Sequence, residues 1–295
     1  MSEKLKILVT GTNGQLGKGL QDLAPSYPQF QFVFLSKDDM PIHQFELVRH
    51  FFNTLRPAYC INCAAYTAVD KAESEKDLAF LINGEAVGVL ASICKEQQVK
   101  FIHVSTDYVF NGDATYPYTE NFPTDPVNVY GASKLEGEKQ AIHLNPDSII
   151  IRTSWVYSSY GKNFVKTMMR LMGEKDEVKV VNDQIGSPTY AADIAETILT
   201  IIVKSSSIES KWQPGIYNFT NEGIISWYEL AEAIKEIIKC PCDVKPIATS
   251  AYPTAAKRPA YSVLDKTKIQ ETFGVQLKDW KKSLAICIEK ISGTH

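Results

Sequence analysis

A glycine-rich turn directly after the first apolar run of the chain restricts the possible folds more than any other feature. Residues 5–10 are a short apolar, β-branched run, and Gly11, Gly14 and Gly17 follow it at once. Glycines let the backbone turn tightly and approach a pyrophosphate, and the next helix offers free N–H groups and the positive end of its dipole. The pattern predicts a dinucleotide-binding βαβ unit. A glycine-rich turn in another type of α/β protein is the alternative.

Strand-like and helix-like segments then alternate through the first half of the chain. Strands are expected at 31–35, 59–63, 100–105 and 148–153, and helices at 45–55, roughly 72–96 and 130–144. This alternation predicts an α/β fold, a Rossmann-type doubly wound parallel sheet with helices on both faces. We expect the dinucleotide-binding domain at 1–155, with returning segments near 182–220. A smaller, discontinuous C-terminal substrate domain is expected at 156–181 and 221–295.

The end of the second expected strand bears on the choice of dinucleotide. An acidic residue there favours NAD, whereas a basic or small residue tolerates the 2′-phosphate of NADP. Ser36 and Lys37 occupy this position, and Asp38 and Asp39 follow them. We therefore favour NADPH and keep NADH open, because Lys37 is equally compatible with being a simple loop charge.

Small and polar residues follow the third and fourth expected strands, at the edge where doubly wound sheets bind ligands. The residues at these two strand ends are Ala65, Tyr66 and Thr67, and Ser105, Thr106 and Asp107. Small side chains after the third strand would let a cofactor lie against it. The hydroxyl and carboxyl groups after the fourth strand predict chemistry there, and a turn of hydrogen-bonding residues is the alternative.

Tyr130 and Lys134 follow a long Pro-, Gly- and Asn-rich loop and are spaced as neighbours on one face of a helix. A phenol with a pKa of about 10 is a poor acid–base catalyst at neutral pH. A nearby ammonium stabilises the phenolate, and lowering its pKa to about 7 requires about 4 kcal/mol. The pair predicts general acid catalysis, and a solvated surface pair is the alternative.

Composition narrows the class of protein. The 295 residues are 44% hydrophobic and 22% charged, and a net charge of -3 gives no basic field for nucleic acid. We expect no signal peptide, because a strand begins almost at once, and no membrane span, because no apolar run approaches about 20 residues. Six cysteines, several in apolar runs, indicate a reducing cytoplasm. Cys240 and Cys242 lack nearby His or Cys partners, so we expect no metal there.

The second half continues with mixed elements. Helices are expected at 163–172, 191–203, 226–238 and 280–291, and strands at 178–181 and 215–220. We expect the strand at 215–220 to return to the main sheet, and Glu229 to complete a capping box with Ser226. The irregular segment 248–264 contains Lys257 and Arg258. Because arginine offers a planar fork to phosphate oxygens, this pair suits a diphosphate, and a solvated basic pair is the alternative.

The glycine triplet, Ser105-Thr106 and Tyr130-x-x-x-Lys134 occur in the order typical of extended short-chain dehydrogenases/reductases, and the chain resembles that superfamily. From residue 5 to about 285 it resembles, more narrowly, the dTDP-4-dehydrorhamnose reductase family. The matching stretches are Thr67–Glu75, Ser105–Phe110, Asn128–Gly131, Arg152–Tyr157, Asn182–Gln184 with Gly186 and Pro188, and Tyr252–Thr254 with Arg258 and Pro259. Trp155 and the last stretch make the resemblance specific.

The resemblance implies a role for each matching residue. Tyr130 would donate a proton to a carbonyl oxygen, Lys134 would bind the nicotinamide ribose, and Thr106 would hydrogen-bond the substrate oxygen. The residues implied around the dinucleotide are Gly11, Asn13, Gly14, Gln15, Leu16, Gly17, Ser36, Lys37, Ala65, Tyr66, Thr67, Tyr130 and Lys134. The residues implied at the sugar nucleotide are Thr106, Asp107, Trp155 and Arg258.

The resemblance also implies an activity. A member of this family would reduce the 4-keto group of dTDP-4-dehydro-L-rhamnose with NAD(P)H, as a cytoplasmic monomer or homodimer, in the last step of dTDP-L-rhamnose synthesis. The alternatives are a nucleotide-sugar epimerase or dehydratase, and a non-catalytic subunit resembling the regulatory subunit of methionine adenosyltransferase. Some relatives dimerise around Mg²⁺ bound by carboxylates. Because no Glu follows closely after Gly17, we expect no metal here.

Overall fold

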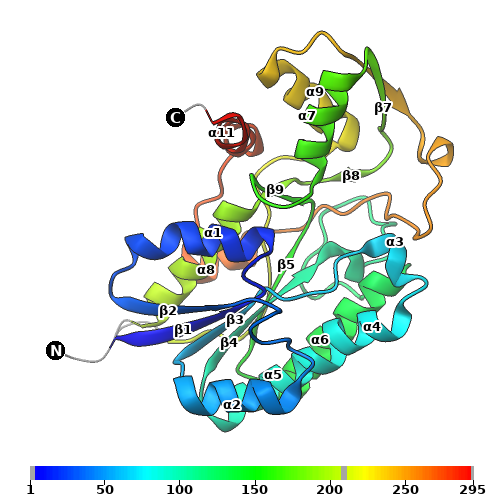
Figure 1. The fold of residues 1–295 in the computed structure, drawn as a ribbon. Helices are drawn as coiled ribbons and strands as arrows, with labels where there is room; N and C mark the ends of the chain where they lie inside the picture. The colour runs from blue at the N-terminus through cyan, green and yellow to red at the C-terminus, as the bar shows by residue number, and fades with distance from the viewer. Residues whose placement is uncertain (1–3, 207–210, 294–295) are drawn as a thin grey trace.

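The computed structural model describes residues 4–206 and 211–293. A six-stranded parallel sheet runs through its centre in the order β10-β5-β4-β3-β1-β2 (Figure 1). Its strands are β1 Leu5–Thr10, β2 Phe30–Leu35, β3 Tyr59–Asn62, β4 Lys100–Thr106, β5 Ile149–Thr153 and β10 Gly215–Asn218. The strand order reverses between β1 and β3, and doubly wound sheets bind ligands at such a switch point. The predicted Rossmann-type sheet is confirmed.

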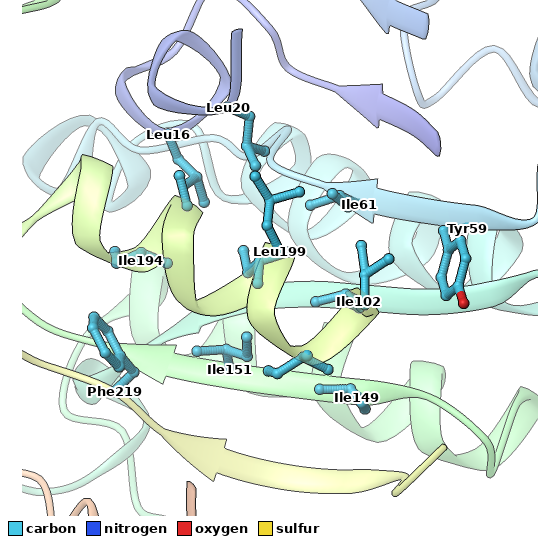
Figure 2. Packing of buried hydrophobic residues seen from close by; sticks show 14 of the residues in the cluster. Leu16, Leu20, Tyr59, Ile61, Ile102, Ile149, Ile151, Ile194, Leu199 and Phe219 are labelled. Carbon is cyan, nitrogen blue, oxygen red and sulfur yellow. The ribbon is translucent and has the colours of Figure 1, made fainter. Parts of the chain in front are cut away.

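Helices cover both faces of this sheet (Figure 1). The helices on one face are α1 Gln15–Leu23 and α8 Ala191–Ser205, and those on the other are α2 Phe45–Leu55, α5 Ala86–Glu96 and α6 Val129–Leu144. Strand residues alternate between the two layers. Ile61 and Ile102 point toward α8 and pack near Leu199 (Figure 2), whereas their neighbours Cys60 and Phe101 lie in the cluster on the opposite face. With both faces covered, the carboxyl ends of the strands are left for a ligand.

The segment predicted as one helix from about residue 72 to 96 is broken. A separate short helix, α3, covers Val69–Ala72, and α4 Lys76–Phe80 then continues through a π-helical turn at Leu81–Glu85 into α5. The buried Asn83 side chain in this turn accepts a hydrogen bond from Tyr66 N and donates to Tyr66 O. It also donates to Ser133 Oγ on α6. The π-helical turn, a feature frequent at functional sites, thus ties the segment after β3 to α6.

The same helix bears on the expectation about membrane spans. Lys76–Glu96 has 21 residues and is apolar enough to cross a membrane by length and composition. The premise that no apolar run approaches about 20 residues was therefore wrong, because an interrupted helix passes this test even with an isolated charge such as Glu85. The absence of a membrane span itself stays a prediction. In the structure, 56% of the most apolar window is buried within the protein, as in a core helix.

The carboxy-terminal segments build a second apolar cluster beyond the sheet. Its elements are α7 Phe164–Glu174, α9 Trp227–Ile238, α11 Trp280–Ser292 and the parallel pair β7 Glu177–Val181 and β12 Asp243–Ile247. The predicted capping box is confirmed, because Ser226 Oγ accepts from Glu229 N and the Glu229 carboxylate accepts from Ser226 N. The sequence did not predict β12, since Pro246 and its charged neighbours disfavour a strand everywhere except at an exposed edge.

Shorter elements join this cluster to the sheet. They are the pairs β6 Val156–Tyr157 with β9 Thr189–Tyr190 and β8 Ile185–Gly186 with β11 Ile225–Ser226, and the unpredicted helix α10 Thr267–Phe273. Strand β10 returns to the main sheet beside β5, as predicted. The division into a dinucleotide-binding and a substrate-binding domain stays a prediction. Of the residues assigned to these domains, 1–3, 207–210 and 294–295 lie outside the described residues.

Candidate active site

A cavity of about 980 Å³ lies at the carboxyl ends of β1, β3, β4 and β5. Its volume is at the upper end of the usual range for small-molecule sites. The predicted site residues in its wall are Gly11, Asn13, Gly14, Gln15, Leu16, Lys37, Ala65, Thr67, Thr106, Asp107, Tyr130, Lys134 and Trp155. The structure therefore brings residues from six separate segments of the chain to one space.

The glycine turn after β1 forms one wall of this cavity. Gly11 has φ +65, and a Cβ there would lie 2.5 Å from Ala64 N, so the turn packs directly on the end of β3. Gly14 is the N-cap of α1 and supplies no side chain to cap it. The first N–H groups of α1 are consequently open to a ligand, and a pyrophosphate fits this donor set and the positive helix end.

The residues after β2 include one cation in the cavity wall and one carboxylate that is hydrogen-bonded within its own turn. Asp39 Oδ2 accepts hydrogen bonds from Ser36 N at 2.9 Å and from Ser36 Oγ at 2.7 Å. These bonds hold the pKa of Asp39 below its usual value. Lys37 and Asp38 line the cavity instead. Ser36, expected at the ribose, is thus engaged with its own turn.

Helix α6 carries Tyr130 and Lys134, and its start is fixed by two contacts. Asn128 Oδ1 caps the helix by accepting from Gly131 N at 2.8 Å. A Cβ at residue 131 would lie 2.1 Å from Tyr108 O, so only glycine lets the helix approach the end of β4 this closely. The Tyr108 and Tyr130 rings meet edge to face with centroids 5.7 Å apart. Tyr130 is therefore held beside Thr106 and Asp107.

The pKa of Tyr130 is raised in the ligand-free protein. Burial raises it to about 12, and the Asp107 carboxylate adds to the rise, while a hydrogen bond with Thr106 opposes it. Lys134 does not counter this rise in the pKa of Tyr130. The physical reason is that Lys134 Nζ points to the carbonyl oxygen of Val104, to which it donates at 2.7 Å. The lowering expected from Lys134 together with a bound nicotinamide ring stays a prediction.

Lys134 is itself 2% exposed, although it lines the cavity. Burial lowers its pKa to about 8, against the opposing fields of Glu138 and Cys63. Glu138, one turn further along α6, makes a buried bidentate ion pair with Arg152 on β5. This pair fixes the helix to the sheet and leaves Lys134 without a carboxylate of its own.

The end of β4 holds polar atoms without partners. Thr106 Oγ1 donates to Asp107 Oδ1 at 2.9 Å, but Asp107 Oδ2 has no partner. Two other buried hydroxyls in the cavity wall, Ser105 Oγ and Thr153 Oγ1, are also unpaired. Burial raises the pKa of Asp107 to about 7. Buried polar atoms normally find partners, so this group indicates a polar ligand at this place.

Two stacked tryptophans close the cavity on the carboxy-terminal side. Trp155 has φ +48 and its ring lies 3.7 Å from that of Trp227 at an angle of 12°. Trp227 is the first residue of α9 and packs in turn on Phe164. The close fit of Gly186, where a Cβ would lie 2.6 Å from Trp155 Cε2, fixes this ring further. The pair offers a rigid apolar wall to a ligand ring.

Four predicted site residues do not reach the cavity wall. Besides Ser36, Gly17 packs on Thr12, and the Tyr66 hydroxyl donates to Glu75 Oε2 at 2.6 Å. Arg258 Nη2 donates to Asp70 Oδ2 at 2.7 Å. The guanidinium is thereby engaged with a carboxylate after β3 rather than left open to a diphosphate.

Sequence reasoning missed several residues that the structure places at or behind the cavity. Trp227 lines it, Asn83 ties α6 in place, and Asn62 and His103 lie under Lys134. A polar residue inside an apolar strand run was the available signal for Asn62 and His103, because a buried polar group requires a partner. In the part of the chain that the structure describes, no three His, Cys, Asp or Glu residues are grouped to hold a metal ion.

Comparison with known proteins gives a consistent result. The model of the RmlD substrate binding domain matches residues 5–292. A dTDP-4-dehydrorhamnose reductase of Aggregatibacter actinomycetemcomitans is 42% identical, over 95% of this chain and 97% of that one. The crystal structure of a dTDP-4-dehydrorhamnose reductase from Clostridium acetobutylicum superposes with a TM-score of 0.92 at 39% identity, covering 98% of this chain and all of that one. A Bacillus anthracis dTDP-4-dehydrorhamnose reductase in complex with NADP gives 0.91 at 38% identity, with the same coverage.

Proposed function

The chain belongs to the RmlD substrate binding domain family, and the three relatives described above are dTDP-4-dehydrorhamnose reductases, so we propose that it is an NAD(P)H-dependent reductase of this kind. It reduces the 4-keto group of dTDP-4-dehydro-L-rhamnose to give dTDP-L-rhamnose, the last step of dTDP-rhamnose biosynthesis. The observation that carries the proposal is one cavity with two unlike walls. An open helix N-terminus and glycine turn face one part, and Thr106, Asp107 and Tyr130 face another.

The dinucleotide, when bound, supplies a hydride to the ketone carbon. The side chains of the protein manage the charge that develops on the ketone oxygen. Tyr130 gives its hydroxyl proton to that oxygen, and Thr106 donates a hydrogen bond to it. Thr106 can do so when its hydroxyl turns from Asp107 toward the substrate. One hydride and one proton then account for the new C–H and O–H bonds.

Tyr130 requires help to act at neutral pH, because burial raises its pKa in the ligand-free protein. The bound ribose and the Lys134 ammonium supply this help in our proposal. Lys134 holds the ribose hydroxyls and places positive charge near the phenolate that Tyr130 leaves behind. Glu138 and Arg152 keep the helix in register while this charge changes.

The dinucleotide is NADPH or NADH, and the end of β2 supports NADPH. Asp39, one of the two carboxylates that follow β2, accepts hydrogen bonds from Ser36 N and Oγ and is engaged there. Lys37 in the cavity wall supplies a cation for a 2′-phosphate. Asp38 lies in the same wall and keeps NADH a working alternative.

The sugar nucleotide lies between the end of β4 and the tryptophan pair. Asp107 Oδ2, Ser105 Oγ and Thr153 Oγ1 lack partners and suit the hydroxyls of a hexose. Trp155 packs on the ligand from the other side. Arg258 reaches the diphosphate only after leaving Asp70, so substrate binding exchanges one carboxylate partner for phosphate.

The proposed binding partner is a small molecule, a dTDP-ketosugar, and not a nucleic acid or a membrane. The proposed compartment is the cytoplasm, where the protein acts as a monomer or homodimer. The net charge of -3 supports the absence of a nucleic-acid partner.

The test is oxidation of NADPH and of NADH in the presence of dTDP-4-dehydro-L-rhamnose, followed by identification of the product. We expect one dTDP-L-rhamnose per NADPH oxidised, formed roughly 100-fold or more slowly with Tyr130→Phe. An oxidised dinucleotide that stays bound through purification, with no net oxidation of added NADPH, would favour an epimerase or dehydratase. Capture of a methionine adenosyltransferase without any ketosugar reduction would favour the non-catalytic subunit.

A further inference from the structure

A chain of buried hydrogen bonds runs behind Lys134, and the proposed mechanism does not use it. It consists of Thr10 on β1, Asn62 at the end of β3, His103 on β4 and Lys134 on α6, each at most 2% exposed. Thr10 Oγ1 lies 2.6 Å from Asn62 Oδ1, Asn62 Nδ2 lies 2.9 Å from His103 Nδ1, and His103 Nε2 lies 3.2 Å from Lys134 Nζ. Four elements of the fold therefore meet in one polar line.

The direction of these bonds is set at the Asn62 end. Asn62 Oδ1 accepts from Thr10 Oγ1 and also from the main-chain N–H of Ala64 at 3.2 Å. If the amide were reversed, its NH₂ group would face the Ala64 N–H, donor against donor. Asn62 therefore presents its NH₂ group to His103 Nδ1, which must accept.

This arrangement selects one form of the histidine ring. A neutral imidazole that accepts at Nδ1 carries its proton on Nε2, and that N–H points at Lys134 Nζ. An ammonium has no lone pair to receive it, whereas an amine has one. Val104 O accepts an N–H from Lys134 in either state, at 2.7 Å.

We infer that His103 is a positioning residue that stabilises the neutral amine form of Lys134 in the ligand-free protein, with Asn62 selecting the tautomer that does so. The inference rests on the proposed dinucleotide site but not on the identity of the sugar. The reaction would then begin with Lys134 as an amine–ammonium mixture rather than as a fixed positive charge.

The charged groups around Lys134 are compatible with this state. Tyr130 and Glu138 flank it on α6, Cys63 faces it from the end of β3, and His103 from β4. Glu138 is occupied by Arg152, so it does not pair with the ammonium. Burial lowers the pKa of Lys134 to about 8, and burial together with Lys134 holds the pKa of His103 well below its usual value, so the ring stays neutral.

Dinucleotide binding is then linked to the uptake of a proton by Lys134. The diphosphate and ribose hydroxyls favour the ammonium, so binding draws a proton onto Lys134. Because the protein with Lys134 protonated binds the dinucleotide more tightly, the affinity is highest below pH 8 and falls as the pH rises above 8. This linkage also explains how Tyr130 can be a weak acid in the free protein and still act once the dinucleotide is bound.

The test is calorimetry of NADP⁺ binding at pH 8 in buffers of different ionisation enthalpy, which reports protons taken up. We expect uptake of up to about half a proton in the wild-type protein, the largest value possible near the midpoint of one group. Asn62→Asp replaces the NH₂ group by an acceptor, so His103 protonates Nδ1 and offers Nε2 to an ammonium. Uptake should then fall below about half of the wild-type value. Thr10→Ser keeps the hydroxyl and should retain wild-type uptake.

A second measurement needs no variant. Nitrogen-15 NMR of the imidazoles in the ligand-free protein distinguishes the two tautomers, and His103 should carry its proton on Nε2. A proton on Nδ1, or equal uptake in Asn62→Asp and wild type, would overturn the inference. If NADP⁺ does not bind at all, the proposed function fails, and the NMR result still decides the state of His103.

Discussion

Two groups of buried polar side chains near helix α6 differ in how completely their polar atoms are paired. Behind Lys134, the side chains of Thr10, Asn62 and His103 all have partners within 3.2 Å. In front, at the end of β4, Asp107 Oδ2 and the Ser105 hydroxyl have none. Both sides are buried, so exposure to solvent does not explain the difference.

This contrast separates what the fold has already organised from what it keeps for a ligand. A paired buried network costs little and holds its members in one geometry, whereas an unpaired buried polar atom costs about 1–3 kcal/mol. Of the two sides compared, the protein bears that cost in front of the helix, where the proposed sugar binds. The paired side chains behind the helix position Lys134. The unpaired atoms in front of it lower the stability of the protein without ligand, and a ligand that pairs with them recovers this free energy on binding.

The largest expected effect comes from removing the proton donor at the front. Tyr130→Phe should reduce kcat by roughly 100-fold or more, the usual scale for general acid catalysis, and leave thermal stability nearly unchanged. Steady-state NADPH oxidation with the ketosugar measures this. Tyr116→Phe, at an exposed tyrosine, is the matched control and should keep wild-type activity. Wild-type turnover in Tyr130→Phe would contradict the proposed role of Tyr130 as proton donor at the ligand side of the helix.

A smaller effect, an increase in stability, is expected from replacing Asp107. Its pKa is raised to about 7 in the folded protein, so ionisation opposes folding increasingly between pH 4 and 7 and fully above pH 7. Asp107→Asn should therefore stabilise the protein by on the order of 2 kcal/mol at pH 8 and by less at pH 5, while lowering activity.

Denaturant unfolding at the two pH values tests this prediction. Asp113→Asn, at an exposed aspartate, should change stability by less than about 0.5 kcal/mol at either pH. Equal stabilisation by Asp107→Asn at pH 5 and pH 8 would mean that the front carboxyl carries no ionisation penalty.

The smallest expected effect lies at the exposed edge of the cavity. Lys37→Ala should raise KM for NADPH roughly fivefold, with little change for NADH, because an exposed cation contributes about 1 kcal/mol to a phosphate contact. Lys71→Ala, at an exposed lysine outside the cavity wall, serves as the control. An equal loss for both dinucleotides would place Lys37 away from the 2′-phosphate.

The sequence predicted the parts of this site that depend on local pattern. The glycine turn, the spacing of Tyr130 and Lys134, and the Ser226 capping box all follow from residue type at short range. The state of Tyr130 did not follow, because its pKa depends on how deeply the phenol is buried. The pairing of Arg258 with Asp70 joins residues 188 positions apart, and no local pattern reports such a contact.

The hydrogen-bond partners in the paired network behind Lys134 were also not predictable from the sequence. Asn62 and His103 sit in strands that read as apolar runs, and only the sheet register brings them side by side. Their polarity was visible in the sequence, but their partners were not. Most of the site residues that the sequence singled out line the cavity, whereas their pKa values and hydrogen-bond partners required the fold.

The most direct test of the central claim follows the hydride itself. The protein would be supplied with NADPH carrying two deuterium atoms at C4 of the nicotinamide and with dTDP-4-dehydro-L-rhamnose, and the sugar product examined by NMR. The account predicts dTDP-L-rhamnose with one deuterium at C4 of the sugar. A product without deuterium at that carbon, or recovery of the ketosugar unchanged, would contradict it.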